Sequence, residues 1–372
     1  MNVKMILPAK EMNIGQSAII KILGIGGGGC NAVNRMIAAN VGKVEFVAIN
    51  TDAQALLKSS ASDVLQIGEK ITKGLGVGGN PDVGRRAAEE STEEIRERIV
   101  GSDMIFVTAG MGGGTGTGAT PVVAKIAKEE EVLTIGVVTK PFEHEGKIRM
   151  EQAEEGIKNI KEYTDALIVI PNERVFNVIS ERIALDAFYH IIDDVLRQSI
   201  QAITDVITIP GEINRDFADV KNILNNAGTA LIGIGEGTSF DVKEVVKKAV
   251  TSPLLDNYDI SKAAKALVNI TTNSTVTALT LQEIFKHIKD YGISGHIFFG
   301  HTIDNRLDDK IKIVIIATGF DIVDEFKNTI EYSNSQLDFS SEHDFKSEKI
   351  DPSKPAYTYW KPKFLKHKDS KI

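Results

Sequence analysis

The feature that most constrains this chain is a loop in which six of nine residues are glycine. The loop, Gly110–Gly118 (GMGGGTGTG), directly follows the apolar run Met104–Ala109 and precedes a helical pattern that begins near Thr120 and Pro121. A purely structural turn needs one or two glycines, and each further glycine costs roughly 0.5–1 kcal/mol of backbone freedom. The sequence therefore predicts a loop whose backbone closely approaches a phosphate group.

A second glycine-rich loop lies nearer the start of the chain. Gly24–Asn31 (GIGGGGCN) ends an apolar run, opens a helical pattern and satisfies G-x-G-x-x-G, which by itself is a weak signal. Two such loops at the carboxyl ends of two strands suit a polyphosphate. The net charge of -8 repels such a ligand, so the site has to consist of backbone N–H groups and helix N-termini.

Short apolar runs alternate with amphipathic helical patterns in the first half of the chain. The runs are apolar on both faces, which is typical of buried parallel strands. They are Ile19–Gly24, Phe46–Asn50, Met104–Ala109, Leu133–Thr139 and Ala166–Ile170. Helix-length segments such as Pro81–Ile99 and Pro121–Glu130 follow them. This alternation predicts an α/β fold with a doubly wound parallel sheet.

One long helix and a second, smaller α+β domain are predicted after this sheet. Apolar residues recur at helical spacing over Leu185–Ile207, and Pro210 and Gly211 then end the pattern. Further strands and helices follow, at Ala266–Thr271, Ile297–Ile303, Lys312–Gly319, Val242–Val250 and Ala278–Lys289.

These patterns divide the chain into five parts. We expect an N-terminal extension at 1–15, a nucleotide-binding domain with the central helix at 16–208, and a second domain at 209–322. Residues 323–356 are rich in polar and charged residues and predict a disordered linker. Residues 357–372 interleave aromatic residues with lysines and predict a peptide that docks on a partner.

Composition restricts the location and the partners. A single cysteine, Cys30, forms no internal disulfide, and no run approaches about 18 uninterrupted apolar residues. We therefore expect a cytoplasmic protein without direct membrane insertion. The acidic balance argues against nucleic acid as a partner, and the seven scattered histidines offer no zinc site.

Two familiar nucleotide-binding classes differ from this pattern. The P-loop motif G-x-x-x-x-G-K-[ST] is absent from the sequence. An NAD-dependent Rossmann oxidoreductase would use the first loop together with Glu45 or Asp52, but this alternative leaves the second loop unexplained.

Several segments resemble the tubulin/FtsZ family, and within it the bacterial cell-division proteins of the FtsZ type. The second loop resembles the signature loop of that family, and four further segments match in order over about Ile19–Phe320. These segments are Asn50–Leu56, Ile71–Gly76, Val138–Phe142 and Asn214–Asp219. The resemblance implies a GTP-binding domain, a long central helix and a smaller second domain.

The resemblance also implies which residues bind the nucleotide. The phosphates and part of the nucleoside would contact Gly27, Gly28, Gly29, Cys30, Asn31, Gly114, Thr115 and Gly116. Glu145 and Arg149 match the family's contacts to ribose and base. Their four-residue spacing on a helix also suits a surface ion pair, and the residues by themselves favour this second interpretation.

An acidic residue of the long helix would accept hydrogen bonds from guanine. Asp193 and Asp194 are the candidates, and because neighbours on a helix point about 100° apart, only one of them faces the base. The ungapped match favours Asp194. Phe188 or Tyr189 would stack on the guanine, with a core position as the alternative for Phe188.

The implied activity is GTP hydrolysis coupled to head-to-tail polymerisation into filaments that form the division ring at mid-cell. Mg²⁺ is expected with the triphosphate. The tail Trp360–Lys366 resembles the family's C-terminal peptide only loosely, by its Pro-x-Phe-Leu-Lys core, and implies docking to the membrane-tethering protein FtsA and to other division proteins. A scaffold that senses GTP without hydrolysing it is the remaining alternative.

Three polar residues after the long helix are the catalytic candidates: Asn214, Asp216 and Asp219. Capping of the following helix by Asn214 or Asp216 is the structural alternative. A helix of some twenty residues spans about 30 Å, so these side chains should lie far from the glycine loops of their own chain. A head-to-tail neighbour would bring them to the γ-phosphate and so complete the site between subunits.

Overall fold

The computed structural model describes residues 18–175, 185–209, 216–255, 259–293 and 295–320, with side chains of the long helix described from His190 onward. The described elements belong to one compact unit. The predicted extension at 1–15, linker at 323–356 and docking peptide at 357–372 lie outside these residues, and the domain boundaries stay predictions.

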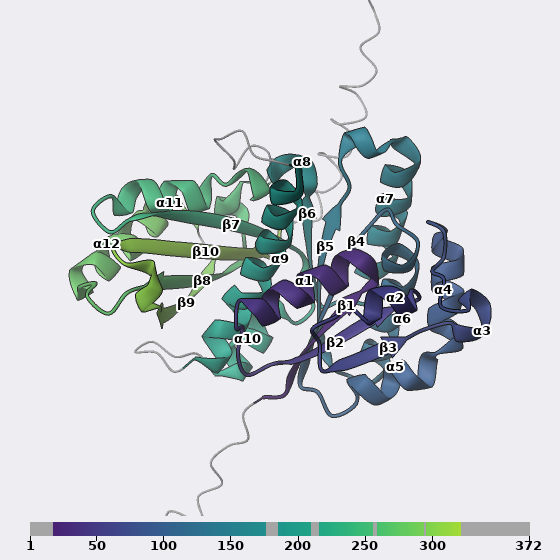
Figure 1. The fold of residues 1–372 in the computed structure, drawn as a ribbon. Helices are drawn as coiled ribbons and strands as arrows, with labels where there is room; N and C mark the ends of the chain where they lie inside the picture. Colours follow the sequence, from purple (N-terminus) through teal and green to yellow (C-terminus); the bar gives the residue numbers. More distant parts are fainter. Residues whose placement is uncertain (1–17, 176–184, 210–215, 256–258, 294, 321–372) are drawn as a thin grey trace, which may run out of the picture. The chain divides into compact units, whose positions relative to one another are not determined.

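In the described part of the chain, ten strands form one sheet in the order β3-β2-β1-β4-β5-β6-β7-β10-β8-β9 (Figure 1). Strands from β3 to β7 pair in parallel, β10 is antiparallel to β7 and β8, and β9 is parallel to β8. The strands are β1 Ile20–Ile25, β2 Glu45–Asn50, β3 Asp63–Gln66, β4 Met104–Gly110, β5 Leu133–Lys140, β6 Ala166–Pro171, β7 Gly228–Thr238, β8 Lys265–Thr272, β9 His296–Ile303 and β10 Lys310–Thr318.

Helices cover both faces of this sheet, which confirms the predicted α/β class with a smaller α+β second part. They are α1 Gly26–Ala38, α2 Ala53–Leu56, α3 Glu69–Thr72, α4 Pro81–Glu90, α5 Thr92–Ile99, α6 Thr115–Glu129, α7 Lys147–Lys161, α8 Asn172–Val175, α9 Leu185–Thr208, α10 Phe217–Leu224, α11 Val242–Val250 and α12 Ala278–Asp290.

Alternate residues of the parallel strands enter two different cores, which explains why these strands are apolar on both faces. Ile22 packs with residues of α1, α9 and α10, whereas the next residue, Leu23, packs with residues of α4 to α7. A third core lies between α11, α12 and the strands β7, β8 and β10.

The predicted long helix is present as α9 and connects the two parts of the sheet. Its buried residues Ile192, Leu196 and Ile203 belong to the core that also includes β5 and β10. The helix packs against α1 on one side and contacts β8, β9 and β10 on the other. It therefore borders both the glycine loops and the second part of the protein.

Two helix predictions were wrong in detail. The segment Pro81–Ile99 is not one helix but two, α4 and α5, separated at Ser91, whose hydroxyl accepts a hydrogen bond from the Gly68 N–H at 3.1 Å. The helix expected near Thr120 begins at Thr115, inside the glycine loop, and Pro121 lies within it.

Candidate nucleotide-binding site

The two glycine loops meet at one edge of the sheet. Strands β1 and β4 are neighbours, but the chain continues from β1 to β2 on one side and from β4 to β5 on the other. Such a switch in strand order opens a crevice at the carboxyl ends of the strands, where α/β proteins bind ligands. The loops that follow β1 and β4 both lie at this crevice.

A pocket of about 570 Å³ occupies the crevice. Both glycine loops line it, together with residues that follow β2, β5 and β6 and with one turn of α9. The lining residues that the argument uses are Gly27, Gly28, Asn31, Gly110, Gly113, Gly114, Thr115, Gly116, Glu145, Arg149, Asn172, Ile192 and Asp193.

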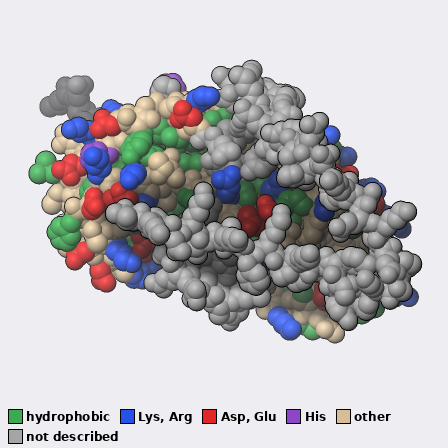
Figure 2. All heavy atoms as spheres, turned by 90° about the horizontal axis from the view of Figure 1, so that it is seen from above, with side chains coloured by type: hydrophobic (Ala, Val, Ile, Leu, Met, Phe, Trp, Pro, Cys, Tyr) green, Lys and Arg blue, Asp and Glu red, His purple; other side chains and the backbone are tan. Residues whose placement is uncertain are grey.

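Two helices begin at this pocket. The first turn of α1 contains Gly27 and Gly28, and α6 begins at Thr115. A helix N-terminus carries about half a positive charge and free N–H groups, so two of them form a strong site for an anion. On the face shown in Figure 2, acidic and basic side chains are interspersed over the described surface.

Glycines allow the two loops to pack backbone against backbone. A Cβ on Gly26 would lie 2.8 Å from the Gly116 nitrogen, and a Cβ on Gly28 would lie 3.2 Å from the Gly110 nitrogen. No side chain fits at these contacts without moving the loops. The close approach of the loops therefore requires glycine on both.

Part of the glycine content has a packing role that the sequence analysis did not foresee. A Cβ on Gly114 would lie 2.3 Å from Val77 Cγ2, and one on Gly118 would lie 2.0 Å from the Pro81 oxygen. At Gly116 the added atom would meet the Gly110 oxygen at 2.6 Å. A side chain at Gly114 or Gly116 would therefore meet the protein before it met a bound phosphate.

Of the binding residues predicted in the two glycine loops, all except Gly29 and Cys30 line the pocket. A Cβ on Gly29 would lie 2.3 Å from the Thr108 oxygen. The Cys30 thiol is directed at the Gly24 and Ile49 carbonyl oxygens, at 3.6 and 3.7 Å. Burial raises the pKa of this thiol to about 11. Both residues therefore pack the loop against the sheet.

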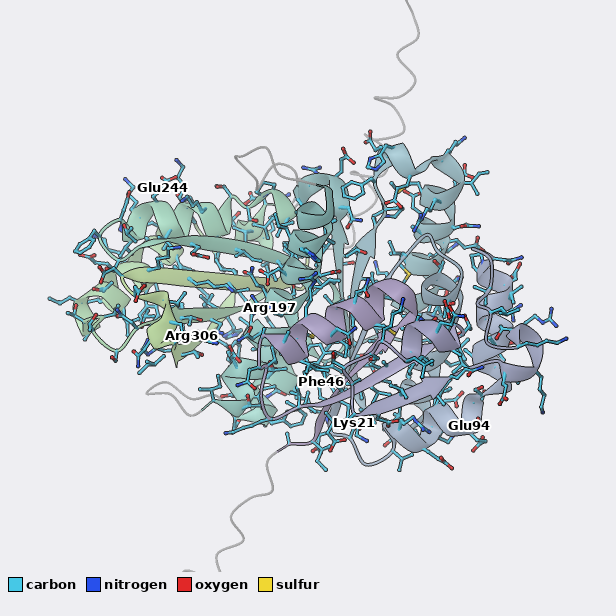
Figure 3. All side chains as sticks on the ribbon, viewed as in Figure 1. Lys21, Phe46, Glu94, Arg197, Glu244 and Arg306 are labelled. Carbon is cyan, nitrogen blue, oxygen red and sulfur yellow. The ribbon has the colours of Figure 1, made fainter. Side chains whose placement is uncertain are left out.

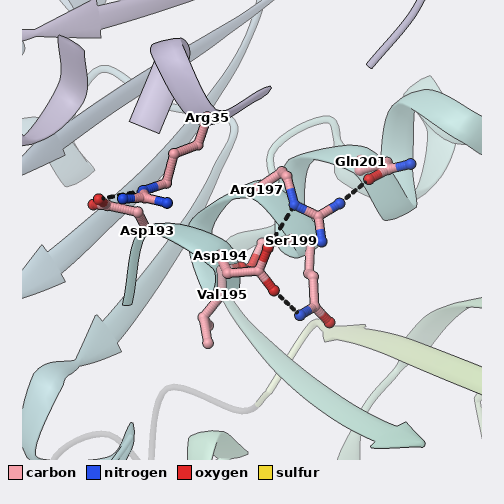
Figure 4. Close-up of polar contacts among 8 residues, drawn as sticks. Arg35, Asp193, Asp194, Val195, Arg197, Ser199 and Gln201 are labelled. Atoms are coloured by element: carbon pink, nitrogen blue, oxygen red, sulfur yellow. Dashed lines mark hydrogen bonds and ion pairs between the residues drawn. The ribbon is translucent and has the colours of Figure 1, made fainter. Parts of the chain in front are cut away.

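The two adjacent aspartates of α9 face different surroundings (Figure 4). Asp193 lines the pocket and accepts a hydrogen bond from Arg35 Nε at 2.8 Å. Asp194 instead lines a second cavity and accepts hydrogen bonds from Arg197 at 2.7 Å and Gln198 at 2.5 Å. The geometry thus favours Asp193, and not Asp194, as the acceptor for a base. The side chains of Phe188 and Tyr189 lie outside the described residues.

Glu145 and Arg149 form the ion pair that the residues alone favoured, and their contacts to ribose and base stay predictions. They form an ion pair with 2.9 Å between Oε2 and Nη1, and both line the pocket. Glu145 also accepts a hydrogen bond from the Phe142 N–H at 2.9 Å, which fixes its position.

Asn172 is a pocket residue that the sequence analysis missed. It is buried, lines the pocket, and its Oδ1 atom has no hydrogen-bond partner among the described residues. A buried amide oxygen without a partner is costly, so a ligand donor at this position would be stabilising. The available signal was its place directly after β6, at the same edge of the sheet as the glycine loops.

The catalytic candidates lie apart from the pocket. Thr208, the last residue of α9, is fifteen residues beyond Asp193, or about 22 Å along the helix. Asp216 caps α10 by accepting a hydrogen bond from the Asp219 N–H at 2.8 Å, as the structural alternative predicted. Neither carboxylate lines the pocket, and Asn214 lies outside the described residues.

The second cavity, of about 510 Å³, lies between α9 and the strands of the second part. Arg197 and Arg306, labelled in Figure 3, both line it. Burial raises the pKa of Asp205 there to about 6 and lowers the pKa of Lys312 to about 8. In this cavity the interactions of Asp205 and Lys312 with their neighbours do not fully offset the cost of burying their charges.

Two further features concern the described residues alone. They contain no group of three or more His, Cys, Asp or Glu side chains placed to hold a metal ion. None of the helices in this part of the chain is long and apolar enough to cross a membrane.

Comparison with known proteins accounts for both parts of the chain. Residues 19–180 match the Tubulin/FtsZ family, GTPase domain, and residues 228–321 match the FtsZ family, C-terminal domain. The structure resembles that of an empty FtsZ dimer from M. jannaschii, with 43% identity and a TM-score of 0.78, over 82% of this chain and 89% of that one.

More distant structures share the fold. CetZ1 from Haloferax volcanii, solved as a GDP-bound monomer, has 22% identity and a TM-score of 0.72 over 86% of this chain and 100% of its own. CetZ2 from the same organism, solved as a GTPγS-bound protofilament, has 21% identity and a TM-score of 0.69 over 86% and 99%. Given the identity to the M. jannaschii protein and both domain matches, this chain belongs to the Tubulin/FtsZ family.

Proposed function

We propose that this protein binds GTP in the pocket between the glycine loops and hydrolyses it to GDP and phosphate. The observation that carries the proposal is that the pocket is lined by two kinds of group. Two helix N-termini attract an anion, whereas the Asp193 carboxylate on α9 repels phosphate and can accept hydrogen bonds from a base. Guanine offers the adjacent N1–H and 2-amino donors that such a carboxylate accepts.

Hydrolysis would take place between two copies of the chain. Asp219 does not line the pocket, and α9 ends about 22 Å along the helix from Asp193 before the chain reaches it, so we expect a second subunit to supply it. The M. jannaschii FtsZ was solved as a dimer and CetZ2 as a protofilament, which supports self-association. Asp216 also caps α10, so replacing it would change stability as well as catalysis, and Asp219 is the candidate whose substitution we test.

In this arrangement the Asp219 carboxylate would orient a water molecule and accept its proton. The water oxygen forms a bond to the γ-phosphorus, the bond from that phosphorus to the β–γ bridging oxygen breaks, and GDP leaves with the electron pair. The helix N-termini of α1 and α6 would stabilise the negative charge. A head-to-tail contact of this kind repeats into an open filament.

We further propose the biological setting that follows from FtsZ similarity. The filaments would form the division ring at mid-cell in the cytoplasm, bind FtsA and other division proteins through residues 357–372, and take Mg²⁺ with GTP. The NAD-dependent alternative is not favoured, because residues 19–180 match the GTPase domain of this family and the M. jannaschii FtsZ structure covers 82% of the chain.

The test follows light scattering and phosphate release after GTP is added to the purified protein. We expect both signals to rise together above a critical protein concentration. Assembly without phosphate release would favour the GTP-sensing scaffold instead. Bound NAD and no bound guanine nucleotide in the purified protein would refute the proposal.

Subunit mixing tests catalysis between copies. Asp219→Ala should bind GTP and associate but release phosphate very slowly, and adding a variant with a damaged pocket should partly restore phosphate release. Glu244→Ala is a matched control, because Glu244 is the third residue of α11 as Asp219 is of α10, and each follows an aspartate cap. Full activity of Asp219→Ala in assembled protein would contradict shared catalysis.

A further inference from the structure

Arg35 does not line the pocket but contacts a residue that does. Its Nε atom donates to Asp193 Oδ2 at 2.8 Å, and the contact joins α1 to α9 (Figure 4). The Asp193 side chain is 16% exposed and that of Arg35 is 32% exposed. This is therefore a partly buried ion pair between two helices that pack against each other.

The contact leaves Asp193 able to bind a base. Arg35 occupies one lone pair of Oδ2, and no described residue donates to Oδ1. A carboxylate offers about four lone-pair sites, so both oxygens can still accept the two adjacent donors of guanine. Arginine is a donor only and stays charged at all relevant pH values. Its favourable interaction with the Asp193 carboxylate therefore persists over the whole pH range.

The charge of Asp193 depends on this neighbour. Burial raises the pKa of Asp193, Arg35 opposes that rise, and the adjacent Asp194 adds to it. Glu145 and Arg149, paired with each other, are the other charged groups on the pocket wall besides Asp52. A protonated Asp193 would present an O–H donor to the N–H donors of guanine and could accept fewer bonds from them.

Resting on the proposed function, we infer that Arg35 is a positioning residue for guanine recognition, which holds Asp193 in the orientation and the charged state that select guanine. The same helix would then serve both ends of the ligand. The N-terminus of α1 faces the phosphates, and Arg35, in its last turn, fixes the carboxylate that reads the base.

The test compares the affinities of the purified full chain for GDP and IDP between pH 5 and pH 8. IDP lacks the 2-amino group, so the GDP-to-IDP ratio reports the bidentate contact. Arg35→Ala should weaken GDP binding at least tenfold at pH 7 and bring the ratio close to one. It should also move the acid loss of GDP binding to a higher pH, because Asp193 then protonates more readily.

Two more variants separate positioning from structure. Arg35→Lys retains the positive charge without the planar guanidinium. Compared with Arg35→Ala, it should bring the pH profile of GDP binding back toward that of the unmodified protein more fully than it does the GDP-to-IDP ratio. Arg197→Ala is the matched control, because it removes the Arg–Asp pair on the next residue, Asp194, which faces the second cavity. Its GDP-to-IDP ratio should equal that of the unmodified protein.

The outcomes distinguish this inference from the proposed function. Failure of the unmodified chain to bind GDP would remove the proposed function itself. If the unmodified chain binds GDP and Asp193→Asn loses it, but Arg35→Ala keeps the ratio and pH profile of Arg197→Ala, only the role of Arg35 is overturned. Weaker GDP binding by Arg35→Ala with an unchanged ratio would likewise overturn it, since that is the result of a purely structural role.

Discussion

Gly27 offers the sharpest test of the phosphate site, because a side chain there meets ligand space and not protein. A Cβ on Gly27 has no atom within 4 Å, and the residue lines the pocket in the first turn of α1. In a helix the Cα–Cβ bond tilts toward the N-terminus, which here is the end at the pocket. Gly27→Ala should therefore fold normally and place a methyl group toward the phosphates.

The expected effects on stability and on binding have opposite signs. Replacing glycine by alanine at a compatible position stabilises a protein by about 0.4–1 kcal/mol through the unfolded state. Losing one hydrogen bond between a backbone N–H and a charged phosphate costs about 1.5–3 kcal/mol. That loss corresponds to a roughly 10- to 150-fold weaker GTP affinity.

The assay combines thermal unfolding without nucleotide and titration with a fluorescent GTP analogue. Gly42→Ala is the matched control, because its Cβ meets only the Asn40 oxygen at 4.0 Å and Gly42 lies outside the pocket. Both variants should unfold at the same or a higher temperature, and only Gly27→Ala should bind weakly. Equal GTP affinity of the two variants would refute phosphate binding at the N-terminus of α1.

Three further predictions concern stability in other parts of the structure. Gly114→Val should lower the free energy of unfolding by about 1–3 kcal/mol in thermal unfolding without nucleotide, because its Cβ would lie 2.3 Å from Val77 Cγ2; unchanged stability would contradict the packing role. Asp216→Ala should lose about 0.5–2 kcal/mol of stability through the α10 cap, whereas Asp219→Ala should lose less. Asp205 has its pKa raised from 3.8 to about 6 by burial, so its contribution to stability is complete below pH 3.8 and is lost as the pH rises through 6. At pH 7.5 the free energy of unfolding of Asp205→Asn, measured in urea, should therefore exceed that of the unmodified protein by up to about 3 kcal/mol. This difference should shrink toward pH 5.

The sequence predicted the strands that form an apolar run and missed two, β3 and β7, whose apolar pattern is short or interrupted. β4 and β5 are apolar on both faces, so their runs stand out. β3 is four residues long and begins at Asp63, at the edge of the sheet, where burial is incomplete. β7 contains glycines that resemble a loop, yet a Cβ on Gly233 would lie 2.1 Å from the Ala249 oxygen. Those glycines let α11 pack directly on the strand.

The site could be located from the sequence, but the role of each residue could not. Glycine loops after two strands identified the pocket, because the carboxyl ends of parallel strands share one edge of the sheet. Whether a particular residue faces the ligand depends on contacts that no local pattern records. The Cys30 thiol is directed into the protein by the carbonyl oxygens of Gly24 in β1 and Ile49 in β2. Asn172 reaches the pocket because of the register of β6 beside β5.

The two Arg–Asp pairs of α9 differ in what a movement of that helix would do to them. The pair of Arg197 and Asp194 lies within α9 and moves with it, whereas the pair of Arg35 and Asp193 joins α9 to α1 and would separate. If Arg35 orients Asp193 for guanine, a bound nucleotide stabilises the present position of α9 against α1. By reciprocity, any contact that shifts α9 weakens guanine binding by the same factor. Because α9 also contacts β8, β9 and β10, a subunit that docks on the second part of the protein would act on the nucleotide through the Arg35–Asp193 pair.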